Sequence, residues 1–217
     1  MAKVRVHNFL VSLDGYSAGP EQSLENPFGV GGMVVGDWFV RTETFLKMQG
    51  QPGGSTGTDN DFAARWGVNV GAFIMGRNMF GPIRGEWPDE SWQGWWGPEP
   101  PYHNPVFVLT HHLRPSIPMA GGTTFYFTDE PIEAVLEQAI QAANGKDVQI
   151  GGGVHTVQQF LRAGLIDEMH LAIAPVLVGG GERLFDNLGD GPAGYRVTEW
   201  VGTPAAQHAV LEKVGAR

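Results

Sequence analysis

The chain of 217 residues contains no cysteine. This absence excludes disulfide frameworks, thiolate catalysis and zinc sites built on cysteine, and it leaves the redox compartment open. Basic residues are also scarce, because 14 Lys and Arg stand against 23 Asp and Glu, for a formal net charge of -9 at pH 7. A chain with this balance repels a polyphosphate backbone, so we expect no nucleic-acid partner.

Long hydrophobic runs are missing as well. The first seven residues lack the apolar core of a secretory signal, and no stretch approaches membrane-spanning length. We therefore expect a cytoplasmic protein with no membrane partner. The length is sufficient to bury one hydrophobic core, and no linker or internal repeat divides the chain, so we expect a single domain over residues 1–217.

Strand patterns alternate with helical ones along the sequence. Apolar runs predict strands at 4–11, 71–75, 106–109, 124–128 and 147–150. Helices are expected at 37–48, 132–140 and 156–163, with a short one that Asp59 or Asp61 caps and that ends at Trp66. Residues 168–174 alternate, and 195–201 with 207–214 resemble an antiparallel pair. This order indicates an α/β fold with a mostly parallel sheet, helices on both faces and antiparallel C-terminal strands.

Residues 84–105 form a segment rich in tryptophan, proline and glycine. Its four tryptophans are Trp87, Trp92, Trp95 and Trp96. Proline and glycine disfavour regular structure here, while the indoles supply flat apolar faces. The segment is either a lid that stacks on a planar substrate or a packed surface loop or dimer contact.

The triplet Gly151, Gly152 and Gly153 joins a predicted strand to a helix that begins near Thr156. Glycines allow a ligand to approach the backbone, and the free amides at a helix start favour a diphosphate. A tight strand-to-helix turn also prefers glycine. The pattern is not G-x-G-x-x-G, and no P-loop lysine follows it.

Two further strand ends carry hydrogen-bond donors. Gly76, Arg77 and Asn78 follow one buried strand, and Thr110 with His111 follows another. Arg77 can bind a phosphate through two parallel hydrogen bonds, or it can simply pair with a surface carboxylate. Ligands of open α/β sheets bind at the carboxyl ends of strands, so three such ends suggest a dinucleotide lying across the sheet edge.

The ordered set of these motifs resembles the dihydrofolate reductase-like superfamily. It is most similar to the branch that contains the reductase (pyrimidine reductase) domain of the riboflavin-biosynthesis deaminase/reductase and its stand-alone relatives. The motifs are Ser12-Leu13-Asp14-Gly15, residues 75–80, residues 108–111, residues 150–153, Gly164 to Leu171 and Pro175 to Gly181. The resemblance extends over nearly the whole chain.

The resemblance implies a doubly wound mixed sheet that binds NADPH, and because relatives are often homodimers we expect a homodimer. It assigns three sets of residues to the cofactor: Gly76, Arg77 and Asn78 to the adenosine phosphates, Thr110 and His111 to the 2′-phosphate, and Gly151, Gly152, Gly153, Val154, His155 and Thr156 to the diphosphate.

The first strand and the loop at Asp14 would border the nicotinamide and the substrate. Asp14 is the candidate for proton handling or substrate orientation, although an Asp-Gly turn is equally consistent with a structural role. The family pattern usually has lysine where this chain has Tyr16, and no single carboxylate matches the one of classical dihydrofolate reductases, for which Asp59 and Asp61 are only possibilities.

These motifs predict an NADPH-dependent reductase that transfers hydride to a small heterocycle, pterin-like or aminopyrimidine-like, or to an imine or carbonyl. The alternative is a non-catalytic protein of the same fold that binds a nucleotide or another small ligand. We expect no metal site, because the adjacent His111 and His112 cannot share one face and no carboxylate stands at a suitable spacing.

Overall fold

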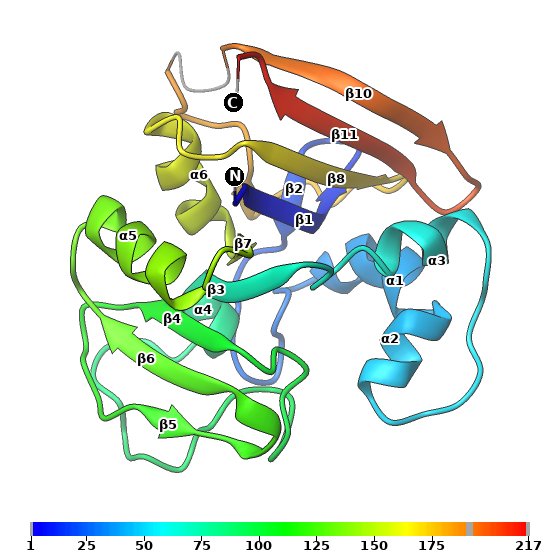
Figure 1. Cartoon of the computed structure of the whole chain (residues 1–217). Helices are drawn as coiled ribbons and strands as arrows, with labels where there is room; N and C mark the ends of the chain where they lie inside the picture. The colour runs from blue at the N-terminus through cyan, green and yellow to red at the C-terminus, as the bar shows by residue number, and fades with distance from the viewer. Residues whose placement is uncertain (1, 190–192, 216–217) are drawn as a thin grey trace.

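The computed structural model describes residues 2–189 and 193–215, and its central feature is a nine-stranded sheet (Figure 1). The strand order is β10-β11-β8-β1-β7-β3-β4-β6-β5. Six neighbouring strands run parallel: β8 (Glu168–Ala174), β1 (Val4–Ser12), β7 (Asp147–Gly152), β3 (Val70–Gly76), β4 (Pro105–Leu109) and β6 (Thr124–Thr128). Their carboxyl ends therefore meet along one edge of the sheet.

Antiparallel strands complete both sides of this parallel centre. β5 (Ile117–Pro118) pairs with β6, while β11 (Gln207–Lys213) pairs with β8 and β10 (Tyr195–Gly202) pairs with β11. A separate ladder joins β2 (Tyr16–Ala18) to β9 (Glu182–Arg183). The expected α/β architecture with antiparallel C-terminal strands is confirmed.

The helices lie on both faces of the sheet (Figure 1). They are η1 (Gly32–Gly36), α1 (Asp37–Val40), α2 (Glu43–Met48), α3 (Thr58–Ala63), α4 (Arg77–Phe80), η2 (Ala120–Gly122), α5 (Ile132–Ala142) and α6 (Val154–Arg162). None of those within residues 2–189 and 193–215 is both long and apolar enough to cross a bilayer.

The central strands are apolar on both faces because each face supports a separate core. In β3, Ala72 and Ile74 pack in the core that α5 and α6 cover, whereas Phe73 and Met75 pack in the core on the opposite side. This alternation follows from the two-residue period of a strand. Burial on both sides fixes the register of β3, and with it the position of Arg77 just beyond the strand end.

The expected helix at 37–48 is wrong in one respect, because two short helices replace it. α1 ends at Val40 and α2 begins at Glu43. Between them the Thr42 hydroxyl donates to the Phe39 carbonyl (2.7 Å) and accepts from the Phe45 amide (3.2 Å). A threonine that caps a new helix start competes with continuation of the first helix, and here the cap prevails.

The expected cap of the next helix is also wrong. Gly57, not Asp59 or Asp61, occupies the N-cap of α3, no side chain caps it, and the helix ends at Ala63 before Trp66. Asp59 lies in the first turn, but its carboxylate accepts a hydrogen bond from the Thr203 hydroxyl at 2.8 Å. Asp59 therefore binds a distant residue, Thr203, instead of capping the main-chain amides at the start of its own helix.

The tryptophan-rich segment packs as an irregular layer over the core on the side of the sheet opposite α5 and α6. Its indole groups donate to main-chain carbonyls: Trp87 to His112 (2.6 Å), Trp92 to Phe80 (2.9 Å) and Trp95 to Met79 (3.0 Å). Three such anchors favour the packed surface loop over the lid, because each would have to break before the segment opened.

Candidate functional site

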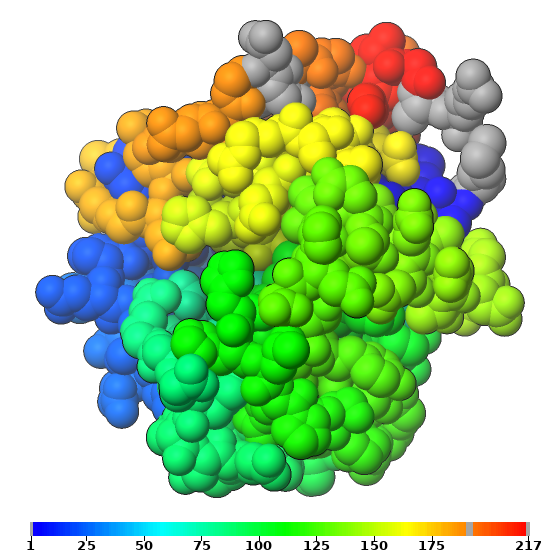
Figure 2. Space-filling model, turned by 90° about the vertical axis from the view of Figure 1, so that its left-hand side faces the viewer, coloured from blue at the N-terminus to red at the C-terminus, as the bar shows by residue number. Residues whose placement is uncertain are grey.

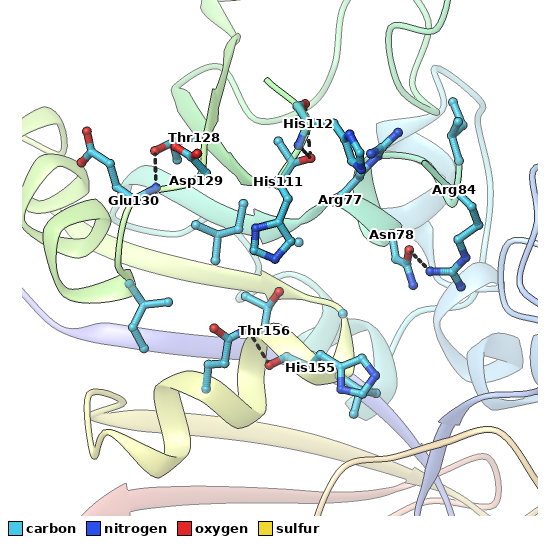
Figure 3. Close-up of a pocket in the computed structure, with 18 of the residues that line it drawn as sticks. Arg77, Asn78, Arg84, His111, His112, Thr128, Asp129, Glu130, His155 and Thr156 are labelled. Atoms are coloured by element: carbon cyan, nitrogen blue, oxygen red, sulfur yellow. Dashed lines mark hydrogen bonds between the residues drawn. The ribbon is translucent and has the colours of Figure 1, made fainter. Parts of the chain in front are cut away.

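The carboxyl ends of β3, β4 and β6 and the start of α6 surround a cavity of about 360 Å³. The segments that carry it, coloured teal, green and yellow in Figure 2, meet on one face of the molecule. Nine residues predicted from the sequence line it: Gly76, Arg77, Asn78, Thr110, His111, Gly153, Val154, His155 and Thr156. The three separated motifs thus come together in one place (Figure 3).

Gly151 and Gly152 lie within β7 and do not line the cavity. They pack instead against α4, since a Cβ atom on either residue would approach the Met79 side chain to 3.3 Å. Gly152 also has a φ of 130°, which favours glycine. These two glycines bring the strand and α4 together, while Gly153 and the residues after it face the cavity.

Gly76 makes the junction between β3 and α6 possible. A Cβ atom at this position would collide with the hydroxyl oxygen of Thr156, in the first turn of α6. The backbone of Gly76 has an ordinary extended φ of -79°, so the requirement for glycine comes from the close approach and not from conformation. The missing side chain lets the end of β3 and the first turn of α6 line one cavity.

The start of α6 offers unused donors to the cavity. No side chain caps this helix, which begins after Gly153, and its first intrahelical bond runs from the Val157 amide to the Gly153 carbonyl. The amides of the first turn therefore have no acceptor in their own helix, and they stand at its positive end. Such an arrangement attracts an anion.

Arg77 brings a positive charge to the same cavity. Its Cζ atom lies 3.9 Å from the centroid of the Trp87 ring, and its buried Nε and Nη2 atoms have no hydrogen-bond partner among the described residues. Burial lowers the pKa of the Arg77 guanidinium from its ordinary value, but arginine remains charged in proteins. A guanidinium that lines the same cavity as these free amides suits a ligand with phosphate groups.

Thr110, His111 and His112 form the turn after β4. The Thr110 hydroxyl accepts from the His112 amide (3.1 Å), which stabilises the turn. Figure 3 shows His111 projecting toward Thr156 and the start of α6. The His112 ring lies 3.0 Å from the Glu86 carboxylate and so belongs to the rim of the cavity.

Other residues of the site were missed in the sequence. The additional polar lining residues are Arg84, Thr128, Asp129, Glu130, Gln159 and Glu182. Thr128, Asp129 and Glu130 stand at the end of a strand that was predicted, so that strand end was an available signal. Arg84 donates to the Asn78 side chain (2.9 Å), a contact for which the sequence offered no signal.

Asp14 does not line this cavity. Its carboxylate accepts from the Ser12 hydroxyl (2.6 Å) and from the amides of Val178 (3.1 Å) and Gly179 (2.8 Å). These bonds, the one from Ser12 above all, lower the pKa of Asp14 to about 2. An ionised carboxylate that joins the end of β1 to residues 178–179 can orient a neighbouring group, but it holds no proton to donate at neutral pH.

Carboxylates near the cavity do not form a metal centre. Within residues 2–189 and 193–215, no group of three or more histidine, aspartate or glutamate side chains is placed to hold a metal ion. The chemistry of the cavity is therefore that of amide, guanidinium and hydroxyl donors, with Asp129, Glu130 and Glu182 on its rim.

The sheet order and the cleft at its carboxyl edge define an α/β protein with a dihydrofolate reductase-like fold. Residues 3–200 match the family described as the RibD C-terminal domain. The chain belongs to this family, and the resemblance inferred from the sequence motifs is confirmed.

Solved structures with the same fold cover nearly all of the chain. A putative riboflavin biosynthesis protein from Shewanella sp. PV-4 is 23% identical with a TM-score of 0.62, and the match covers 98% of this chain and 99% of that one. A pyrimidine reductase-like protein from Corynebacterium diphtheriae is 14% identical with a TM-score of 0.55, covering 98% and 92%. At these identities the likeness shows the fold alone.

Two further matches are partial. Acinetobacter baumannii RibD is 17% identical with a TM-score of 0.57, and the match covers 99% of this chain but 58% of that protein. The uncharacterized protein YyaP of Bacillus subtilis (strain 168) is 44% identical over 41 residues, which is 19% of this chain and 22% of that protein.

Proposed function

We propose that the protein is an NADPH-dependent reductase. The observation that carries this proposal is that the unpartnered Arg77 guanidinium and the uncapped first turn of α6 line the same cavity, which is built from three strand ends. Arg77 and the first-turn amides of α6 can each donate hydrogen bonds to an anion. Two such groups in one cleft suit a ligand that carries two separate phosphate groups. Membership of the RibD C-terminal domain family supports the same cofactor.

The residues of the cavity divide the binding of this cofactor between them. The amides from Gly153 to Thr156 would bind the diphosphate, and Arg77 with Thr110 and His111 would bind the adenosine 2′-phosphate. NADPH, when bound, supplies the hydride from its nicotinamide ring. The chain contributes by binding the cofactor and orienting it toward the end of β1.

The substrate class follows from the family and from the end of β1. A small planar heterocycle, pterin-like or aminopyrimidine-like, or an imine or carbonyl, would occupy the space between the nicotinamide and the Asp14 loop. The ionised Asp14 carboxylate would accept a hydrogen bond from an amino or imine nitrogen of that substrate and so orient it. A water molecule would then deliver the proton that completes the reduction.

A second candidate is a nucleotide-binding protein of the same fold without turnover. One observation favours it: three hydrogen bonds already occupy the Asp14 carboxylate, and its low pKa prevents it from donating a proton at neutral pH. In this case the protein would bind NADPH tightly and reduce nothing.

One experiment separates the two candidates. Calorimetry measures NADPH binding to the purified protein, and absorbance at the nicotinamide band then follows oxidation of NADPH with pterins, aminopyrimidines and imines. Turnover with any of these supports the reductase. Binding without turnover supports the second candidate, and no binding overturns both.

We also infer that two copies associate through β10. This strand forms one edge of the sheet, and its side chains Val197 and Trp200 are 52% and 62% exposed. An edge strand with exposed apolar residues is a template for pairing with another chain.

A further inference from the structure

Trp87 contacts two arginines through its ring, and one of them, Arg77, lines the cavity of the proposed cofactor. The Arg77 Cζ atom is 3.9 Å from the centroid of its ring, and the Arg114 Cζ atom is 5.0 Å away. Phe80 and Phe127 contact the ring edge to face at centroid distances of 5.9 Å and 5.8 Å. The indole is thus fixed by packing as well as by cations.

A hydrogen bond fixes the same indole to the turn after β4. Its Nε1 atom donates to the His112 carbonyl at 2.6 Å. Trp87 therefore joins the residue that follows β3, Arg77, to the turn that contains Thr110 and His111. These are the segments to which the proposed function assigns the 2′-phosphate.

Arg77 lacks other directional contacts. Its Nε and Nη2 atoms have no hydrogen-bond partner among residues 2–189 and 193–215, so the indole face is the contact that orients its guanidinium. A free arginine side chain has many rotamers, and binding a phosphate costs the entropy of ordering it. A cation held over an aromatic face is ordered before the ligand arrives.

We propose that Trp87 is a positioning residue that holds Arg77 ready for the 2′-phosphate and thereby sets the preference for NADPH over NADH. This inference rests on the proposed function, because it takes the phosphate assignment of Arg77 as given. It adds a role for a residue of the tryptophan-rich segment, which lies outside the strand-end motifs.

Trp95 is the matched control within the same segment. Its indole also donates to a main-chain carbonyl, that of Met79 at 3.0 Å, but no arginine stacks on its ring in the described residues. Loss of a hydrogen-bonded indole is therefore common to Trp87→Leu and Trp95→Leu. Loss of the arginine platform is specific to the first.

The test uses two small probes, 2′,5′-ADP and 5′-AMP, which differ in the 2′-phosphate. Calorimetry measures their dissociation constants for the wild-type protein, Trp87→Leu, Trp87→Phe, Trp95→Leu, Arg77→Ala and the double variant Arg77→Ala/Trp87→Leu. Thermal unfolding reports which variants are folded. If the leucine variant does not fold, Trp87→Met makes the same comparison with a longer and more adaptable side chain.

We expect Trp87→Leu to weaken 2′,5′-ADP about tenfold, the scale of one charge-assisted contact, and to change 5′-AMP by less than about twofold. Trp87→Phe keeps an aromatic face and should retain most of the discrimination. The double variant should bind 2′,5′-ADP no more weakly than Arg77→Ala, because a residue that acts through Arg77 has no effect once Arg77 is removed.

Three outcomes would overturn the role of Trp87 alone: equal loss for both probes, no loss, or additive losses in the double variant. A wild-type protein that binds neither probe nor NADPH would instead overturn the proposed function, and the role of Trp87 with it.

Discussion

The Nε2 atom of His170 lies 3.0 Å from the Nδ1 atom of His208, and both side chains are fully buried. The Asn8 main-chain amide donates to His170 Nδ1 (3.2 Å), and the Asn8 Oδ1 atom lies 3.0 Å from the same nitrogen. His208 in turn donates from Nε2 to the Asp59 carboxylate at 2.9 Å. This chain of bonds links β1, β8, β11 and α3 with both rings neutral.

This buried pair predicts a loss of stability on mild acidification. Burial is the main cause that lowers the pKa of both His170 and His208 from the ordinary value of 6.5. Below pH 6.5 these two histidines become protonated in the unfolded chain but stay neutral in the native protein. The free energy of unfolding should therefore fall by about 1.4 kcal/mol per pH unit for each such group.

Urea unfolding at pH 7.5, 6.5 and 5.5 measures this slope. Carboxylates do not interfere, because even Glu168, whose pKa is held at about 2 mainly by the hydrogen bond with His7, changes its contribution only near and below its ordinary value of 4.5. His170→Gln should lower stability at pH 7.5 but reduce the slope of the unfolding free energy between pH 7.5 and 5.5. Equal stability at pH 7.5 and 5.5 would contradict the prediction.

A second prediction concerns the contact between Gly76 and Thr156. Gly76→Ala should destabilise the protein by about 1–3 kcal/mol, because the new methyl group meets the threonine hydroxyl in a packed junction. Adding Thr156→Ala removes that oxygen and should restore part of the loss. Thermal unfolding of the two single variants and the double variant measures this, and strictly additive effects would show that the clash is not the cause.

A third prediction concerns the cofactor preference. Arg77→Ala should weaken NADPH about tenfold or more and NADH much less, since a charge-assisted bond to the 2′-phosphate is lost. Fluorescence titration with both cofactors measures the ratio. Arg196→Ala, an exposed arginine on β10, is the control. An equal loss of affinity for the two cofactors would show that Arg77 does not contact the 2′-phosphate.

A fourth prediction concerns Asp14. Because its pKa is about 2, Asp14 stays ionised throughout the usual assay range, so it should produce no limb in the pH profile of kcat/KM above pH 4. Asp14→Asn should lower kcat/KM, but any acid limb that the wild-type profile shows should remain in the variant, because another group causes it. An acid limb that disappears in this variant would show that Asp14 titrates during catalysis.

A fifth prediction concerns association of two copies. Light scattering coupled to gel filtration should give twice the chain mass of 23.5 kDa. Trp200→Glu places a charge on the exposed edge strand and should shift the protein toward the monomer, while Leu177→Glu, also exposed but outside β10, should not. A monomeric wild-type protein would refute the interface.

Much of the fold was predictable because the central strands are continuous apolar runs. β3 and β6 needed no long-range information, and a parallel sheet gathers the carboxyl ends of its strands whatever lies between them. The convergence of Arg77, Thr110 and Gly153 followed from that topology. Asp59 was misassigned because its partners, Thr203 and His208, are distant in the sequence and compete successfully with a local cap.

Other parts of the site depend on contacts that leave no pattern in the sequence. The stack of Arg77 on Trp87 joins two segments through a loop without periodicity, so its geometry exists only after the chain folds. The glycine triplet that joins β7 to α6 illustrates a different difficulty. Gly151 and Gly153 look equivalent in the sequence, yet one packs on Met79 and the other faces the cavity.

The strand order has a consequence for how the chain is made. β1 leaves the ribosome first, but both of its neighbours, β7 and β8, begin at Asp147 and Glu168. A nascent chain that ends before β7 therefore exposes β1 and one edge of β3 without partners. Such non-local pairing slows folding and leaves unpaired edges open to aggregation. Insertion of β7 between β1 and β3 is thus the event that joins β1 to the other strands and brings Gly153 to the cavity.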